Sequence, residues 1–304
     1  MIYKIYNYHT LIFFITSLFL FVFKITNSLF VTSICFFLIL TIGLSHGALD
    51  NLKGKKILKI YKIKNIILFY LTYIFLSLII IILWNFLPTI TLVLFLVVAS
   101  YHFGKEDSNC LKFKKSILTN LFFVFKGSLI IFAPLFFHFN ETINIFQILN
   151  FDQNILNLLN NNSNIITVFF YLSLLSNIYF LVEQIRYNYK YIFCDLISIV
   201  LINSVLDPLI AFTIYFCFLH SFRHSISLIK ILDKKNFLKG SKTFIKKALP
   251  LTILTGLLYL FALGFLLNSH DLIEAILKVI FIGLASLTFP HILLEYLIEK
   301  YEQT

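Results

Sequence analysis

Long apolar segments alternate with short polar segments along the whole chain. They lie at about residues 11–23, 29–49, 66–86, 89–107, 117–137, 165–185, 191–206, 210–229, 249–267 and 272–298. A helix needs about 20 mostly apolar residues to cross the hydrocarbon core of a bilayer, and most of these segments approach that length. The pattern therefore predicts an all-α, polytopic membrane protein with about ten (8–10) transmembrane helices.

The composition agrees with a membrane protein. Hydrophobic residues make up 60% of the chain and charged residues only 13%, whereas a soluble domain is about half apolar and a quarter charged. The apolar segments leave no room for a soluble domain, so we expect residues 1–304 to form a single integral membrane catalytic domain. The longest polar break, residues 140–164, is expected to be a surface loop with a short interfacial helix at 143–149.

The positive charge is distributed as a topology signal. The formal net charge is +11, but the lysines follow the second, fourth, sixth and eighth apolar segments, for example in the expected loops at 53–64 and 230–247. The alternate loops have almost no Lys or Arg. By the positive-inside rule, both termini are predicted to be cytoplasmic in a multi-pass protein of the inner (plasma) membrane. No nucleic-acid partner is expected.

The cysteines do not suggest a structural or metal role. Cys35, Cys110, Cys194 and Cys217 are scattered and form no CxxC pair. We therefore expect neither a disulfide framework nor a thiolate metal site.

Two histidines in the eighth apolar segment are the first candidates for chemistry. His220 and His224 are four residues apart, so on an α-helix both imidazoles share one face. Imidazole is the commonest metal-binding side chain, and two at this spacing can hold one ion. The alternative interpretation is a pair of buried histidines that hydrogen-bond to neighbouring helices.

Three further histidines fall at a similar depth. His46, His102 and His291 lie near the cytoplasmic ends of their segments. At ~1.5 Å of rise per residue, all five histidines lie within roughly 10 Å of one level. This convergence predicts a metal centre between the helices. Histidine donors suit Fe, Zn, Cu or Ni, and spacing alone does not choose among these metals.

Two aspartates and several glycines accompany these motifs. Asp50 and Asp107 follow two of the histidines by four and five residues. A carboxylate near a ligating imidazole commonly accepts its second N–H, although solvation of a helix end is an equally ordinary role. Gly43, Gly47 and Gly104 would let helices approach closely.

Taken together, four motifs resemble a known family. They are Gly43-Leu-Ser-His46-Gly-Ala-Leu-Asp50, Tyr101-His102-Phe-Gly-Lys-Glu-Asp107, His220-Ser-Phe-Arg-His224 and Pro290-His291. Their order and separations resemble those of the Brp/Blh-like β-carotene 15,15′-dioxygenases, which are bacterial and archaeal membrane proteins. The resemblance covers nearly the whole chain.

The resemblance implies a reaction and a set of ligands. Members of the family use non-haem Fe(II) and O2 to split the central double bond of β-carotene into two all-trans-retinals, which serve retinal-binding rhodopsins. By position, the implied iron ligands are His46, His102, His220 and His224. For His291, Asp50 and Asp107 the resemblance implies support of the ligands or lining of a substrate tunnel.

The physical character of the chain suits such a substrate. β-Carotene dissolves in the lipid bilayer, and binding it requires a long apolar tunnel. The chain has 37 Phe and 16 Tyr residues for such a lining, although most aromatic side chains will face lipid or pack between helices.

Two alternative functions stay open. A di-iron desaturase or hydroxylase would carry clustered boxes of the HxxxH and HxxHH kind, and this chain has a single HxxxH. A metal or small-molecule transporter would place its polar site near the midplane and often contain an internal repeat, and the sequence has no convincing repeat.

Overall fold

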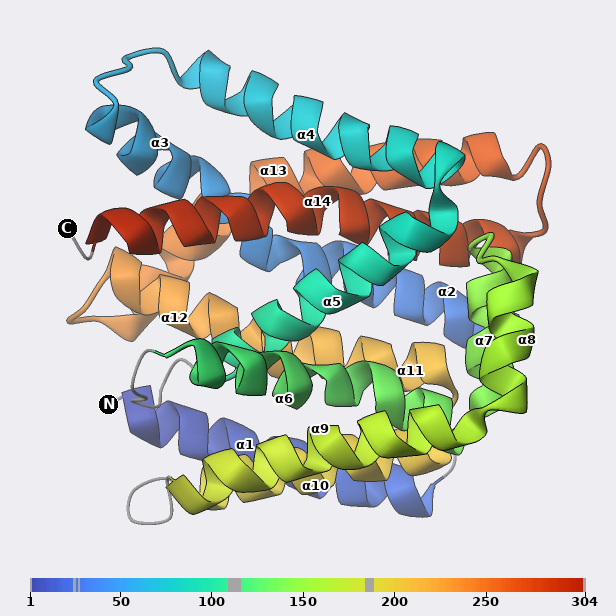
Figure 1. Cartoon of the computed structure of the whole chain (residues 1–304). Helices are drawn as coiled ribbons and strands as arrows, with labels where there is room; N and C mark the ends of the chain where they lie inside the picture. Colours follow the sequence, from blue (N-terminus) through green and yellow to red (C-terminus); the bar gives the residue numbers. More distant parts are fainter. Residues whose placement is uncertain (1, 24–25, 27, 109–115, 184–188, 303–304) are drawn as a thin grey trace. The chain divides into compact units, whose positions relative to one another are not determined.

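The computed structural model describes residues 2–23, 26, 28–108, 116–183 and 189–302 (Figure 1). Within these ranges the chain forms helices and no strand. Nine of the described helical segments are long and apolar enough to cross a membrane. The predicted all-α membrane fold is confirmed, with the number of spans inside the expected range. Cys110 lies outside the described residues.

The chain divides into two compact units. The first contains Met1–Cys35 and Leu96–Arg223, and the second contains Phe36–Phe95 and His224–Thr304. One boundary falls between Arg223 and His224, inside the continuous helical run Pro208–Leu232. The expectation of a single catalytic domain concerns the activity of the whole chain and stays a prediction.

The first unit is built on pairs of packed helices. Its elements are α1 (Ile2–Val22), the end of α5 (Pro88–Glu106), α6 (Ile117–Phe137), α7 (Phe139–Ile148), α8 (Gln153–Asn161), α9 (Ser163–Glu183), α10 (Tyr189–Val205), α11 (Pro208–Ile214) and η3 (Tyr215–Ser221). Helix α6 packs against α9, and α1 packs against α10. Stacked rings join α6 to α9, with Phe136 and Phe170 centroids 4.3 Å apart. The aromatic richness of the sequence thus contributes to helix packing.

The second unit is organised around its last helix. Its elements are η1 (Ile39–Gly43), η2 (Leu44–Leu49), α3 (Asp50–Ile60), α4 (Ile66–Phe86), most of α12 (Phe222–Leu232), α13 (Phe237–Leu266) and α14 (Leu272–Glu302); α2 (Leu29–Leu38) crosses the boundary between the units. Helix α14 contacts α3, α4 and α13 (Figure 1). A buried cluster that includes Leu49, Leu228 and Phe244 joins η2, α12 and α13.

The first lysine-rich segment is mostly helix, and the prediction of a loop at 53–64 was wrong there. Helix α3 forms because Ile57 is buried and because lysine is a good helix former. Gly54 allows close packing, since a Cβ at this position would lie 2.4 Å from the Phe69 ring. The expected loop at 230–247 likewise shortens to the connection 233–236 between α12 and α13.

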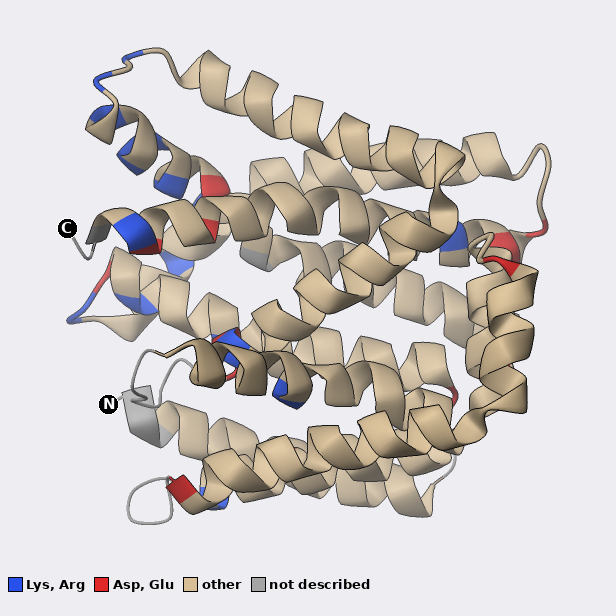
Figure 2. Cartoon of the chain, in the orientation of Figure 1, with Lys and Arg blue, Asp and Glu red and all other residues tan. Residues whose placement is uncertain are grey.

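Many basic residues of the second unit gather at one end, whereas Lys278 lies near the start of α14. Figure 2 shows the lysines of α3, of the connection between α12 and α13, and of the last turns of α14 at the same end of this unit. This clustering agrees with the alternation of charged loops on which the predicted topology depends.

The long polar break is mostly helical. The short helix expected at 143–149 is present as α7 (Phe139–Ile148), whereas the prediction of a loop over the rest of 140–164 was wrong. The segment contains α7 and α8. Their apolar side chains find a buried environment, since Leu149 at the end of α7 and Leu156 of α8 are both buried. The Asp152 side chain caps α8 by accepting hydrogen bonds from the backbone N–H groups of Asn154 and Ile155 at 2.9 and 3.1 Å. Such caps satisfy N–H groups that the first turn of a helix leaves without partners.

Candidate metal centre

The first unit brings two of the predicted histidines together. His102 lies near the end of α5, and His220 lies in η3. Their ring centroids are 5.1 Å apart, with the planes at 73°, and the residues are only 7% and 1% exposed. Two imidazoles whose nitrogens each lie about 2 Å from one ion have centroids roughly 4.5–6 Å apart. The observed separation therefore fits a shared ion.

A buried carboxylate fixes the His220 ring. Nδ1 of His220 donates a hydrogen bond to Oδ1 of Asp107 at 3.0 Å, and the Tyr215 hydroxyl donates to Oδ2 at 2.6 Å. Phe103 packs against the His220 ring with centroids 4.7 Å apart. From its place in the sequence, Asp107 was expected beside His102. Five helical residues turn the chain by about 500°, so positions 102 and 107 face directions about 140° apart.

The second unit repeats this arrangement with different helices. His224 of α12 and His291 of α14 have ring centroids 5.8 Å apart, and each residue is 4% exposed. Nδ1 of His291 lies 3.0 and 2.8 Å from the two carboxylate oxygens of Asp50. The Tyr73 hydroxyl donates to Oδ2 of Asp50 at 3.0 Å.

Each unit thus contains one tyrosine–aspartate–histidine chain of hydrogen bonds. An ionised carboxylate only accepts hydrogen bonds, so the proton of each imidazole stays on Nδ1. Nε2 then carries the lone pair that coordinates a metal, and the carboxylate raises the basicity of the ring. His220 and His291 are therefore held in the tautomer and orientation that metal binding requires.

Glu295 adds an oxygen donor to the second unit. One ligand atom from each of His224, His291 and Glu295 lies within 4.8 Å of the other two. Two histidines and one carboxylate are a donor set typical of non-haem iron oxygenases. Glu295 also forms an ion pair with Lys53 of α3. The sequence analysis missed Glu295, although its spacing of four residues from His291 places both on one helix face.

The remaining predicted residues have mixed outcomes. His46 belongs to η2, but its side chain lies outside the described part of the structure. Gly104 permits the expected close approach, because a Cβ there would lie 1.9 Å from the Phe123 carbonyl oxygen. The same expectation was wrong for Gly47, since no described atom beyond its chain neighbours and its own helix backbone lies within 4 Å of a Cβ at that position.

Two motifs adjoin turns of π-helix. Residues Ile39–Gly43 precede the His46 motif as a π-helix, and Tyr215–Ser221 contains His220. Such turns are rare and frequently occur at functional sites. The sequence argument for His220 and His224 assumed an uninterrupted α-helix, whereas η3 ends between them at Ser221. His220 and His224 belong to different units, and their binding of one ion stays a prediction.

Arg223 of the histidine motif forms a buried network in the first unit. Its guanidinium makes two hydrogen bonds to Asp195 at 2.5 and 2.7 Å and one to Thr10 at 2.8 Å. It also lies 4.2 Å from the centre of the Tyr191 ring. The network ties α1 and α10 to the helix that bears His220. The sequence analysis missed Asp195, although a lone acid within an apolar segment indicates a buried partner.

Comparisons with known proteins agree with the motifs. A family model described as Beta-carotene 15,15'-dioxygenase matches residues 37–299. The chain is also 31% identical over 267 residues to a protein named Beta-carotene 15,15'-dioxygenase from an uncultured marine bacterium, 66A03. That alignment covers 84% of this chain and 90% of the relative. No solved structure matches. All five candidate histidines fall inside the range matched by the family model.

Proposed function

This chain belongs to the β-carotene 15,15′-dioxygenase family, and from that membership we propose that it cleaves the central double bond of β-carotene with O2. The C15=C15′ bond and the O–O bond break, and each carbon takes one oxygen atom. Two molecules of all-trans-retinal form, and the balance needs no further reductant or proton. The family match over residues 37–299 carries this proposal, and it favours this enzyme over a desaturase-type enzyme or a transporter.

We assign iron(II) as the metal and His46, His102, His220 and His224 as its ligands. The spacing of His102 and His220 supports a shared ion. In the second unit, His224 lies in a group with His291 and Glu295 whose donor atoms suit iron. When bound, an iron ion with open coordination positions supplies a site that binds and activates O2.

The two tyrosine–aspartate pairs act through the histidines. Asp107 and Asp50 hold the Nδ1 protons of His220 and His291, and Tyr215 and Tyr73 hold the carboxylates in turn. The overall reaction neither consumes nor releases a proton, and the role that we assign to these groups is to position the imidazoles. Their burial also keeps water away from the imidazoles.

The membrane is part of the mechanism. β-Carotene dissolves in the hydrocarbon layer, where an enzyme whose described part contains nine apolar spans meets it directly. We place the protein in the inner (plasma) membrane with both termini in the cytoplasm, in agreement with the lysines at one end of the second unit (Figure 2). The retinal product would supply a retinal-binding rhodopsin.

Expression in cells that accumulate β-carotene tests the function. We expect the cells to lose their colour and to accumulate retinal, which chromatography identifies. His220→Ala is the matched control, because it removes a proposed ligand and should leave the pigment intact. Unchanged pigment in cells that carry the wild-type protein in their membranes and have ample iron would contradict the proposal.

A further inference from the structure

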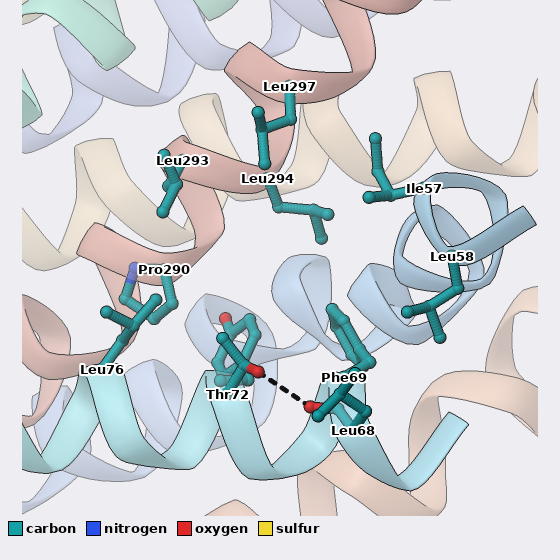
Figure 3. Close-up of a pocket in the computed structure, with 11 residues that line it drawn as sticks. Ile57, Leu58, Leu68, Phe69, Thr72, Leu76, Pro290, Leu293, Leu294 and Leu297 are labelled. Atoms are coloured by element: carbon teal, nitrogen blue, oxygen red, sulfur yellow. Dashed lines mark hydrogen bonds between the residues drawn. The ribbon is translucent and has the colours of Figure 1, made fainter. Parts of the chain in front are cut away.

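A groove in the second unit begins beside the Pro290-His291 motif. Three helices, α3, α4 and α14, supply its walls (Figure 3). The lining residues are Ile57, Leu58, Leu68, Phe69, Thr72, Tyr73, Leu76, Pro290, Leu293, Leu294 and Leu297. Only Thr72 and Tyr73 carry polar atoms in their side chains. The groove is therefore lined almost entirely by hydrocarbon.

Both hydroxyl groups in the groove are bound to the protein. Thr72 donates to the carbonyl oxygen of Leu68 at 2.9 Å. Tyr73 donates to Asp50 at 3.0 Å and lies 3.3 Å from the carbonyl oxygen of Leu287. A ligand in the groove would meet apolar surface, and such a surface selects a hydrocarbon over a polar molecule.

The length and volume of the groove set what fits in it. Figure 3 shows Leu76 and Pro290 at one end and Ile57 and Leu58 at the other. On α14 the lining spans from Pro290 to Leu297, which at 1.5 Å per residue is about 10 Å. The cavity volume is about 190 Å³, below the roughly 300–1,000 Å³ of pockets that enclose a whole drug-sized ligand. The groove thus suits part of a long molecule.

The groove has exposed apolar residues on its walls and adjoins residues of the candidate metal centre. Leu68 and Leu293 on its opposite walls are 46% and 45% exposed, so an apolar molecule can enter from the side. At the inner end, Pro290 directly precedes His291. Tyr73 lines the groove and also bonds to Asp50, which holds the His291 ring.

We propose that this groove holds one end of the carotenoid, with the end group near Ile57 and Leu58 and the polyene running past Pro290 toward His291. The inference rests on the proposed function. Binding of the end group in the groove would limit which double bonds of the polyene reach the histidine, and this contributes to regiospecific cleavage. A lipid acyl chain is the competing occupant.

Filling the far end of the groove tests the proposal. Leu68→Trp adds an indole to the lining, and Leu71→Trp is its matched control, since Leu71 lies on the same helix, is 60% exposed and does not line the groove. For Leu68→Trp we expect at least a 10-fold fall in kcat/KM for β-carotene or a shift to asymmetric products. We also expect less β-carotene to copurify with this variant in the absence of O2, with bound iron unchanged. Leu71→Trp should stay within 2-fold of wild type in each assay.

The outcomes separate the two proposals. A wild-type protein that binds β-carotene but forms no retinal would refute the proposed function. It would not contradict the proposal that the groove binds the carotenoid. If both variants match each other in β-carotene binding, kcat/KM and products, the proposal that the groove holds the carotenoid is wrong. A lipid acyl chain is then the occupant that the groove fits. Should Leu68→Trp not reach the membrane, Leu293→Trp on the opposite wall gives the same test.

Discussion

The close contact of α5 with α6 makes Gly104 a sensitive position. A Cβ at Gly104 would lie 1.9 Å from the Phe123 carbonyl oxygen, and real Cβ contacts essentially never fall under 3.0 Å. The variant Gly104→Ala must therefore move the two backbones apart by more than about 1 Å, at a cost of about 1–3 kcal/mol. His102 is two residues away, and metal–ligand distances in proteins stay within about 0.2 Å of their standard values.

We therefore expect Gly104→Ala to lose its bound metal and to cleave about 100-fold more slowly than wild type. A misplacement of ~1 Å in a reacting group commonly has an effect of this size. Metal analysis and a retinal assay on the purified protein measure both effects. Gly256→Ala is the control, since nothing lies within 4 Å of a Cβ there, and it should match or exceed wild-type stability. Gly127→Ala probes the same contact from α6. Wild-type metal content and rate in Gly104→Ala would refute this reasoning.

Three other perturbations have defined outcomes. Asp107→Asn should weaken metal binding by about 10–100-fold. The His220 Nδ1–H and the Tyr215 hydroxyl both donate to the Asp107 carboxylate, and an amide has only one oxygen to accept them. Wild-type affinity in a chelator titration would contradict this prediction. Asp195→Asn should lower the free energy of unfolding by about 3–5 kcal/mol, because it leaves the Arg223 charge uncompensated. Thermal unfolding in detergent measures this loss. A fall in the unfolding temperature no larger than that of the exposed control Glu141→Gln would contradict the prediction. A reporter inserted at residues 233–236 should be cytoplasmic, and a reading from outside the cell would reverse the topology.

The sequence alone predicted the helical membrane fold, because apolar segments of the length of a bilayer were sufficient for this. It also singled out His102, His220, His224 and His291, which the structure brings together as two pairs. The lysine-rich segment at 53–64 was misjudged, because charge marks exposure to water and does not exclude helix. Buried Ile57 and the close contact at Gly54 provide the packing that makes α3 helical.

The hydrogen-bond partners of the histidines were harder to predict than the histidines themselves. Asp107 bonds to His220, more than one hundred residues away in the chain, and Asp50 bonds to His291. Spacing along one helix carries no information about which distant helix packs against it. The same limit applies to Asp195, whose partner Arg223 lies on another helix. Glu295 is the exception, because its register with His291 was visible in the sequence.

The central proposal is that His46, His102, His220 and His224 bind one iron ion. Metal analysis of the purified wild type, of His102→Ala from the first unit and of His224→Ala from the second tests it most directly. The account predicts about one iron per wild-type chain and almost none in either variant. Full iron retention in either variant, or two ions per wild-type chain with loss of only one in each, would contradict it.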